Sequence, residues 1–328
     1  MDPAILGAHT WSLKELVEQF PPQWRHANKR AIAKVATPPS AKHDGRLAIS
    51  RWRATGLPSS LKVPHVRRQA GHFRYQTPAV EDGSMHWHLN FADPHLFGYA
   101  EGELFAQDEL QCTEHPALVS VGYALEKGVP GQPELQRIAR DGRGATPVLL
   151  EQVPRRCAID SSALYGDQFS IAREDEVLAH TQALNPPTMS HLIALAAIAP
   201  QQGHYTKAQI TDLVRTAFAG FRAAVIRSGQ RAVTLHTGHW GCGAFGGNKG
   251  LVGAIQILSA GAAGVDTVEF WFGSGPGDDS AIEHAFEVAT RLDRCPTAEV
   301  IQRLAEAGYS WGHANENHVP FAPPERDV

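Results

Sequence analysis

Six glycines lie within the stretch from Thr234 to Gly250, TLHTGHWGCGAFGGNKG. An apolar run typical of a strand precedes these glycines, and a run typical of a helix follows them. Glycine at this density lets backbone amides turn outward and come close to a ligand, and a helix N-terminus favours an anion. The stretch therefore predicts a loop whose amides bind a diphosphate.

The same glycines also fit the dinucleotide pattern G-x-G-x-x-G, with Gly241, Gly243 and Gly246 at its glycine positions. That pattern expects an acidic residue at the end of the next strand, about twenty residues further on. Here Asp266 precedes the next strand and Glu269 lies inside it. A nicotinamide-dependent oxidoreductase therefore stays an alternative, and a bound diphosphate is common to both interpretations.

Two carboxylates occupy the first turn of another predicted helix, which begins near Ala106. In this turn Gln107 is followed by Asp108 and Glu109. The helix dipole favours acidic residues in a first turn. From the local sequence alone, this effect explains Asp108 and Glu109 as well as a catalytic role does. Asp93 stands fourteen positions before Gln107. Clustered carboxylates tend to raise the pKa of one member, which would keep an acid protonated.

Other polar residues could bind a metal or act as a nucleophile, but their surroundings favour neither role. His86 and His88 alternate along a predicted strand over residues 84–92 without a third clustered ligand, so a solvated strand face and no metal are expected. Cys242 could pair with His239 as a nucleophile, yet no orienting acid is identifiable among the loop glycines. No cofactor is expected.

Alternation of strands and helices predicts an α/β fold with ligand contacts at the carboxyl ends of its strands. The clearest helix, Lys207–Ser228, has apolar residues at spacings of three and four. Further helices are expected at 174–184, 190–199, 280–292 and 297–307, and further strands at 148–150, 157–160 and 265–272.

Composition indicates an ordinary globular protein of 328 residues, with 43% hydrophobic and 20% charged content. Four widely spaced cysteines without a C-x-x-C fit neither a disulfide framework nor a zinc ribbon. A reducing, cytoplasmic compartment is expected, in the cell of origin or in a host cytosol. The N-terminus does not resemble a secretory signal, and no apolar run approaches the ~20 residues of a membrane helix, so no membrane partner is expected.

Charge divides the chain unevenly. Residues 23–76 carry twelve Lys and Arg against one acid, a net charge of +11, whereas the remainder carries −15. This asymmetry predicts either attraction to a polyanion or a basic part docked on an acidic one. We expect residues 1–76 to form a basic helical and loop-rich appendage with one short helix between Trp11 and Phe20, ahead of a main domain at 77–312 and a polar tail at 313–328.

The glycine stretch closely resembles the diphosphate loop of poly(ADP-ribose) glycohydrolase and its relatives, in which a tryptophan, a cysteine and a phenylalanine interrupt the glycines; here they are Trp240, Cys242 and Phe245. In that family a Phe-Ala-Asn segment leads through three glycines to Gln-Glu-Glu. The corresponding residues are Phe91, Ala92 and Asp93, then Phe97, Gly98 and Tyr99, then Gln107, Asp108 and Glu109. The similarity covers residues 80 to 310 and is strongest at 234–273.

The resemblance implies a macrodomain, with a mixed sheet between helices, that binds ADP-ribose and cleaves its glycosidic bond. Glu109 would protonate the leaving group, Asp108 would hold a ribose hydroxyl or a water, and Asp93 would add a third carboxylate. Residues 80–82 are implied at the adenine edge. The other implied ligand contacts are Asn90, Phe91, Ala92, Gly98, Gln107, His239, Gly241, Gly243, Ala244, Phe245, Gly246 and Phe272, the last of which would stack on adenine.

Several positions depart from the family pattern. Phe97 and Tyr99 replace glycines, His239 replaces an asparagine, and Asp108 replaces a glutamate. The additional carboxylate of Asp93 would suit a cationic guanidinium leaving group. The expected activity is release of single ADP-ribose units from arginine in a modified protein, with poly(ADP-ribose) glycohydrolase activity or a non-catalytic ADP-ribose reader as alternatives. The expected partners are an ADP-ribosylated protein and the product ADP-ribose; nucleic acid is not favoured.

Overall fold

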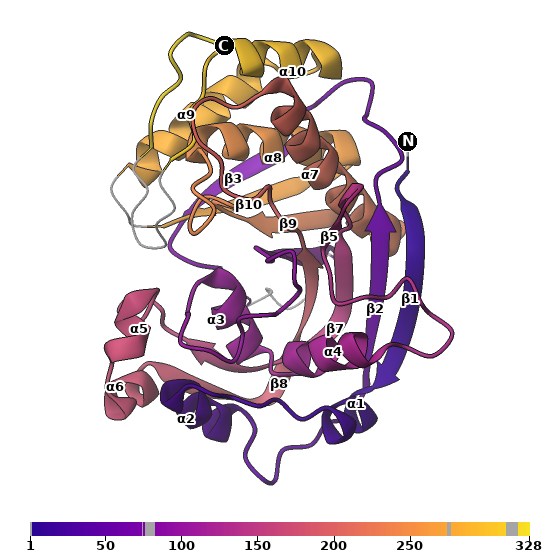
Figure 1. Ribbon diagram of the computed structural model, residues 1–328, viewed down its shortest axis with the longest axis vertical. Helices are drawn as coiled ribbons and strands as arrows, with labels where there is room; N and C mark the ends of the chain where they lie inside the picture. Colours follow the sequence, from indigo (N-terminus) through magenta and orange to yellow (C-terminus); the bar gives the residue numbers. More distant parts are fainter. Residues whose placement is uncertain (1, 74, 76–82, 274–276, 313–320) are drawn as a thin grey trace.

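The computed structural model describes residues 2–73, 75, 83–273, 277–312 and 321–328. Its centre is an eight-stranded mixed sheet with the order β1-β2-β7-β8-β4-β9-β10-β3 (Figure 1). Neighbours from β1 to β8 are antiparallel, and neighbours from β8 to β3 are parallel. The strands of this sheet are β1 (Ala4–Ser12), β2 (Arg46–Arg53), β3 (His65–Ala70), β4 (Met85–Asn90), β7 (Val148–Ile159), β8 (Thr181–Ala194), β9 (Val233–Thr237) and β10 (Thr267–Phe272). A small separate hairpin pairs β5 (Arg140–Asp141) with β6 (Gly144–Ala145).

Helices pack on both faces of the sheet, so the predicted α/β fold with a mixed sheet between helices is confirmed (Figure 1). One apolar core joins α7 to α10 with β4, β9 and β10, and a second joins α1 and α4 with β2, β7 and β8. The helices are α1 (Leu13–Gln19), α2 (Ala27–Ala36), α3 (Gln107–Glu114), α4 (Ala117–Lys127), α5 (Asp167–Ile171), α6 (Glu174–Ala179), α7 (Lys207–Ser228), α8 (Lys249–Ala263), α9 (Asp278–Arg291) and α10 (Thr297–Glu306).

The longest helix, α7, has the bounds that its apolar spacing predicts. Its buried side chains include Ile210, Leu213 and Ala217, which recur every three or four residues and face the sheet. The Thr206 hydroxyl accepts a hydrogen bond from the Gln209 amide at its start, and Gly229, with φ of +66°, ends it.

The parallel strands bring distant segments to one edge of the sheet. In the ladders, Asn90 of β4 pairs with Ala194 of β8, and Thr237 of β9 pairs with Phe270 of β10. These strands run in the same direction, so the segments that follow them all leave from their carboxyl ends. Residues 91–106 and the glycine loop therefore start side by side, as ligand-binding segments in α/β sheets do.

The first 76 residues form more regular structure than expected. Instead of a helix and loops beside the main domain, they supply β1 and β2 at one edge of the sheet and β3 at the other, together with α1 and α2 (Figure 1). The sequence pattern missed these strands because their partners are distant: β3 pairs in parallel with β10, for example Val66 with Val268. Division of the chain at residue 76 stays a prediction, and residues 76–82 and 313–320 lie outside the described structure.

A second correction concerns residues 181–199. The helix expected at 190–199 is wrong, because these residues continue the long strand β8 to Ala194 and then run without regular structure. Leu192, Ile193 and Ala194 are all buried, so both faces of the strand are covered. A short continuous apolar run of this kind does not distinguish a buried strand from a helix. The helix expected at 174–184 ends at Ala179.

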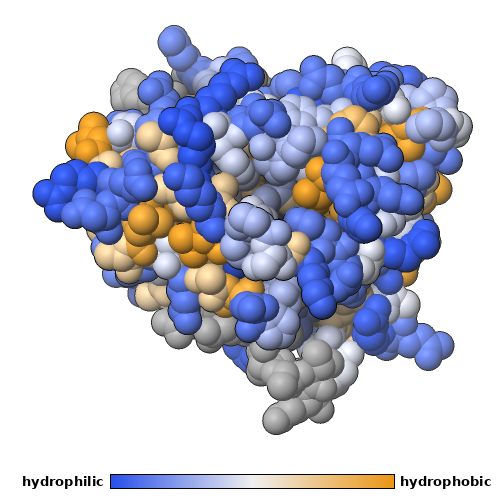
Figure 2. Space-filling model, turned by 90° about the horizontal axis from the view of Figure 1, so that it is seen from below, coloured by the Kyte–Doolittle hydropathy of each residue, from blue (hydrophilic) through white to orange (hydrophobic). Residues whose placement is uncertain are grey.

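Seen from the side of α1, α2 and α6, the surface is largely hydrophilic, and apolar side chains form separate patches (Figure 2). Basic side chains of the N-terminal segment reach solvent, such as Arg25, whose side chain is 82% exposed. Over the described ranges, no helix is both long enough and apolar enough to span a membrane.

Candidate active site

A cavity of about 1020 Å³ opens at the carboxyl ends of β4, β9 and β10. Two predicted segments border it: residues 91–93 with the start of α3, and the glycine loop from Gly238 to Phe245. Residues 159–168, which follow β7, and residues 71–75, which follow β3, complete its walls as far as they are described. Its volume is at the upper end of the range for small-molecule sites and accommodates a dinucleotide-sized ligand.

Asp108 is a buried carboxylate on the cavity wall, in the first turn of α3. One oxygen, Oδ1, accepts a hydrogen bond of 2.8 Å from the Asn90 amide and one of 3.5 Å from the Cys112 thiol. Its other oxygen, Oδ2, has no hydrogen-bond partner among the described residues. Burial raises the pKa of Asp108 to about 6, and the nearby charge of Asp93 acts in the same direction. Asp108 can therefore be ionised at neutral pH and has one oxygen available to a ligand.

Glu109 is also buried on the cavity wall, but in a different electrostatic state. Its Oε2 accepts a hydrogen bond of 3.1 Å from the Ala106 amide, which fixes the carboxyl at the beginning of α3. Burial and then the charge of Asp108 raise the pKa of Glu109 to about 8. Two adjacent carboxyl groups thus have well-separated proton affinities, which is the arrangement that an acid and its anionic partner require.

Asp93 lies on the same part of the cavity wall and is less buried than Asp108 and Glu109. Its Oδ1 accepts a hydrogen bond of 2.8 Å from the His95 amide, in a turn directly after β4. Three carboxyl groups therefore meet at one end of the cavity, as the sequence predicts.

Gln107 joins the end of β4 to the start of α3. Its Oε1 accepts a hydrogen bond of 2.8 Å from the Phe91 amide, and its Nε2 donates one of 3.0 Å to the Leu89 carbonyl. Both atoms of the side-chain amide are thus bonded to the strand. Gln107 and Asn90 position the carboxyl groups, although Gln107 also lines the cavity.

The glycine loop presents backbone amides to the cavity. Gly241 has φ of +69°, and the Gly247 amide donates to the Gly241 carbonyl at 2.9 Å, which folds the loop into a compact turn. Within the described part of the chain, the amides of Gly243, Ala244 and Phe245 donate to no protein acceptor. Three successive free amides on a cavity wall form a site suited to an anion.

The loop is held rigidly from below. The indole of Trp240 donates to the Leu195 carbonyl at 2.9 Å, and Gln256 donates to the Gly238 carbonyl at 2.9 Å. At Gly238, a Cβ atom would lie 2.5 Å from the Trp271 carbonyl oxygen, so no other residue fits without a shift. Glycine is needed here for close packing of the loop on β10.

Two charged residues on the cavity wall, Lys249 and Asp278, were not predicted. Lys249 lines the cavity, and its Nζ lies 2.6 Å from Oδ1 of Asp278. His239 faces the same carboxylate at 3.5 Å, and burial lowers the pKa of His239 to about 4, which keeps the ring neutral. Lys249 and Asp278 thus form an ion pair on the cavity wall, which the sequence pattern missed because it depends on how α8 and α9 begin.

The thiol of Cys242 is unsuited to nucleophilic attack. It is buried and donates to the Trp240 carbonyl at 3.3 Å. Burial raises the pKa of Cys242 to about 12, so the reactive thiolate is not formed at neutral pH. The geometry thus argues against a nucleophilic Cys242–His239 pair, as the sequence does.

A buried ion pair between α3 and β7, on the wall of the cavity, was also missed. Arg155 forms two hydrogen bonds of 2.9 Å with Glu114, and its guanidinium lies 4.5 Å from the ring centroid of Tyr75. Glu114 also accepts from the Ile159 amide at 2.7 Å. All three side chains line the cavity, but they come from segments that only the tertiary fold brings together.

Four of the predicted ligand residues do not line the cavity. Asn90 and Gly246 lie behind its wall, Gly98 is in the loop before α3, and Phe272 is half-buried against the core of α7 to α10. At the end of β10 the lining residues are Trp271 and Gly273. A role for Phe272 in stacking on adenine stays a prediction, and residues 80–82 lie outside the described structure.

The residues that replace family glycines keep part of the glycine geometry. Phe97 adopts φ of +56°, in the left-handed region that glycine favours, and its side chain is fully buried. Tyr99 is 56% exposed and lines the cavity. The backbone therefore retains an unusual conformation at Phe97, and Tyr99 adds an aromatic ring to the cavity wall.

The solvated face expected for His86 and His88 is wrong. His88 is 3% exposed and stacks on His236 with ring centroids 4.2 Å apart, and His86 Nδ1 lies 2.8 Å from His236 Nε2. Burial lowers the pKa of His88 well below its usual value and that of His236 to about 3, so these rings stay neutral. The described residues contain no group of three His, Cys, Asp or Glu side chains that could hold a metal ion.

The two acidic residues considered for the dinucleotide pattern, Glu269 and Asp266, lie away from the cavity. Glu269 lies in the middle of β10 and accepts hydrogen bonds from Arg67 at 3.0 Å and Gln69 at 2.7 Å, both on β3. Asp266 accepts from the Val233 amide at 2.8 Å. Neither carboxylate lines the cavity, so the ribose contact of a nicotinamide-dependent oxidoreductase is missing from it.

Comparison with known families gives a match at residues 159–275, to the model described as poly(ADP-ribose) glycohydrolase, Macro domain fold. These residues extend from the end of β7 through the glycine loop to the end of β10. The match confirms the predicted resemblance and the predicted class of enzyme, a glycosidic-bond hydrolase.

Solved structures with some likeness to the chain include poly(ADP-ribose) glycohydrolases from two bacteria. A mutant of the Deinococcus radiodurans enzyme in complex with ADP-ribose is 15% identical with a TM-score of 0.47, covering 86% of this chain and 93% of that one. The Thermomonospora curvata enzyme is 16% identical with a TM-score of 0.42, covering 85% of this chain and 86% of that one. The same enzyme bound to the inhibitor ADP-HPD is 16% identical with a TM-score of 0.45, covering 83% and 87%.

Proposed function

We propose that this chain, whose residues 159–275 match the poly(ADP-ribose) glycohydrolase model, hydrolyses the glycosidic bond between the distal ribose of ADP-ribose and its leaving group. The observation that carries the proposal is the placement of Asp108 and Glu109 on one wall of a large cavity whose other wall is the glycine loop. ADP-ribose polymer is the first substrate class to test, because the matched family is named for it.

In this proposal the diphosphate lies along the free amides of Gly243, Ala244 and Phe245. Lys249 lines the same cavity, and its ammonium is paired with the Asp278 carboxylate. The distal ribose then reaches the beginning of α3, where Oδ2 of Asp108 is available to accept a hydrogen bond from a ribose hydroxyl. The ligand thus spans the cavity from the loop to the carboxyl groups.

Glu109 is the proposed general acid. With its pKa raised to about 8 by burial and by Asp108, its carboxyl is protonated at neutral pH and can donate to the leaving oxygen as the bond breaks. The ribose then carries oxocarbenium character, which the anionic Asp108 stabilises. The Glu109 carboxylate left by this step can take a proton from the attacking water, which restores the acid.

A second candidate is hydrolysis of ADP-ribose linked to arginine, as the sequence predicts. The observation that favours it is Asp93, a third carboxylate on the cavity wall close to the other two. A guanidinium leaving group is a cation that carboxylates bind in a fork geometry, whereas a ribose leaving group gains nothing from the additional charge.

The test is to incubate the chain with ADP-ribose polymer and with proteins carrying arginine-, glutamate- or serine-linked ADP-ribose, and to measure released ADP-ribose by chromatography. We expect release from polymer, abolished in Glu109→Gln, and Asp93→Asn should reduce release from arginine selectively if that linkage is cleaved. Tight ADP-ribose binding without release from any substrate would instead indicate a reader. Absence of both binding and release would refute the proposal.

A further inference from the structure

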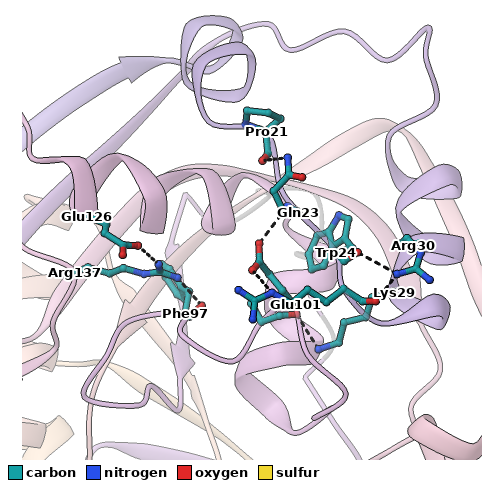
Figure 3. Close-up of polar contacts among 11 residues, drawn as sticks. Pro21, Gln23, Trp24, Lys29, Arg30, Phe97, Glu101, Glu126 and Arg137 are labelled. Carbon is teal, nitrogen blue, oxygen red and sulfur yellow. Dashed lines mark hydrogen bonds and ion pairs between the residues drawn. The ribbon is translucent and has the colours of Figure 1, made fainter.

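One lysine of the basic N-terminal segment is fully buried beside the proposed catalytic residues. Lys29 lies in α2 and has no exposed surface. Its side chain is drawn in Figure 3. Its Nζ donates hydrogen bonds of 2.8 Å to the Ala100 carbonyl and 2.6 Å to the Leu104 carbonyl. Both carbonyls belong to the loop that connects β4 to α3, more than 70 residues away in the chain.

The same loop is fastened at two further places. The Glu101 carbonyl accepts from the amides of Arg25 at 3.0 Å and His26 at 3.2 Å, and the Glu101 side chain accepts from the Gln23 amide at 3.2 Å (Figure 3). Near the start of this loop, the Phe97 carbonyl accepts a hydrogen bond of 3.0 Å from Arg137. Residues 97 to 104 are thus held from both sides just before α3 begins.

A buried ammonium group is costly unless opposite charges and hydrogen bonds compensate for lost water. Lys29 has no carboxylate within ion-pair distance among the described residues, and its two acceptors are backbone carbonyls. The carboxylates whose negative charge favours the ammonium are Asp108 and Glu101, together with Glu109 once it has lost its proton. A methionine would fill similar space without burying a charge, but it would leave the Ala100 and Leu104 carbonyls without this donor, so the ammonium serves to hold those two carbonyls.

We propose that Lys29 is a positioning residue for the hydrolysis: its ammonium fixes residues 100–104, and so holds the first turn of α3, with Glu109, in place against the substrate. This inference rests on the proposed function. It assigns part of the unexplained basic segment a task inside the molecule rather than at its surface. Lys29 itself does not line the cavity, so it acts through the loop and through its charge.

The experiment compares Lys29→Met, which removes charge and hydrogen bonds, with Lys29→Gln, which keeps a donor without the charge. Lys34→Met is the matched control, because Lys34 is an exposed lysine on the same helix. Three quantities are measured for each: kcat for release of ADP-ribose, the Kd for ADP-ribose by calorimetry, and hydrogen–deuterium exchange of amides in residues 96–106 without ligand.

For Lys29→Met we expect faster exchange in residues 96–106, a kcat lower by roughly 10- to 100-fold, the scale for misplacement of a catalytic group by about 1 Å, and a Kd within about threefold of wild type. Lys29→Gln should show a smaller rise in exchange, and Lys34→Met should match wild type throughout. The Kd should hold because, among the described residues, the side-chain hydrogen bonds of α2 go to segments other than the glycine loop.

Unchanged exchange in Lys29→Met, or an unchanged kcat despite faster exchange, overturns the proposal. Equal loss of kcat and of the binding-competent fraction, or failure of both variants to fold, would show a merely structural role and also overturns it. If the wild-type chain releases no ADP-ribose, the proposed function fails, while the exchange measurement still decides whether Lys29 holds the loop.

Discussion

The side-chain amide of Asn90 donates a hydrogen bond of 2.8 Å to Asp108, although one residue ends β4 and the other lies in the first turn of α3. This bond occupies Oδ1 and leaves Oδ2 without a partner among the described residues. It also lowers the pKa of Asp108, against the larger upward effect of burial. The pair therefore sets both the direction and the protonation of the carboxylate next to Glu109.

We expect the rate of hydrolysis to have a bell-shaped dependence on pH, with limbs near 6 and 8. Asp108 must be ionised, so the rate rises through the lower limb, and Glu109 must be protonated, so the rate falls through the upper one. The measurement is kcat/KM between pH 4.5 and 9.5. Asp108→Asn should remove the lower limb along with most activity; a profile that rises monotonically to pH 9.5 would exclude Glu109 as the acid.

The free energy of unfolding should depend on pH through Glu109. The folded-state pKa of Glu109, about 8, lies above its usual value of 4.5, so its contribution to stability is fully present below about pH 4.5 and is lost as pH rises to 8. Glu109→Gln should therefore gain stability relative to wild type between pH 5 and 8.5, by on the order of 1–3 kcal/mol.

Urea unfolding at several pH values measures this difference. The control is Glu103→Gln, which removes an exposed carboxyl three residues before Ala106, and the result for Glu109→Gln is compared with it at each pH. A difference between Glu109→Gln and wild type that does not change with pH would show that the Glu109 carboxyl is not protonated in the folded state.

Removal of the Arg155 guanidinium should destabilise the fold severely. Arg155→Met leaves the buried carboxylate of Glu114 without its paired charge, an effect of about 3–5 kcal/mol. Arg173→Met breaks an ion pair with Asp175 whose side chains are 79% and 72% exposed, and should change the free energy of unfolding far less, because solvent screens exposed charges. Equal free energies of unfolding for the two variants would contradict this assignment.

Substitution of Gly238 should weaken ligand binding. In Gly238→Ala the new Cβ would approach the Trp271 carbonyl oxygen to 2.5 Å, so the loop must shift at its first residue. We expect the Kd for ADP-ribose, measured by calorimetry, to rise at least about tenfold, equal to 1.4 kcal/mol. Gly142→Ala is the control, since nothing lies within 4 Å of a Cβ there; similar affinities for both variants would argue against the loop as the binding site.

Local spacing predicted those parts of the fold that local interactions determine. The bounds of α7 follow from its apolar face and its cap, and the site carboxylates follow from their place at the start of α3. Strands β1 to β3 were missed because Ala4 pairs with Arg53 and His65 with Thr267, and neither pairing leaves a pattern in its own neighbourhood. β8 was missed because both its faces are buried near Ala194, which removes the alternation of exposed strands.

The site was predictable where motif and function coincide, and not where tertiary contacts create the environment. Asp93, Asp108 and Glu109 and the loop amides are the predicted groups that the cavity brings together. Lys29 lies about 80 positions before Glu109 in a segment that reads only as basic. Its burial depends on the path of α2 beneath the loop, which no spacing in the chain indicates.

The pairing of β3 with β10 constrains how the molecule can be made. On a ribosome, residues 65–70 emerge some two hundred positions before the strand that they must join. Until β10 is made, β3 has no partner strand in the sheet. The nascent polypeptide therefore has to keep residues 65–70 from pairing with other strands. Truncation of the gene at its 5′ end would remove β1, β2 and β3 from the two edges of the sheet. The strands next to them would then expose unpaired backbone groups, which favours aggregation.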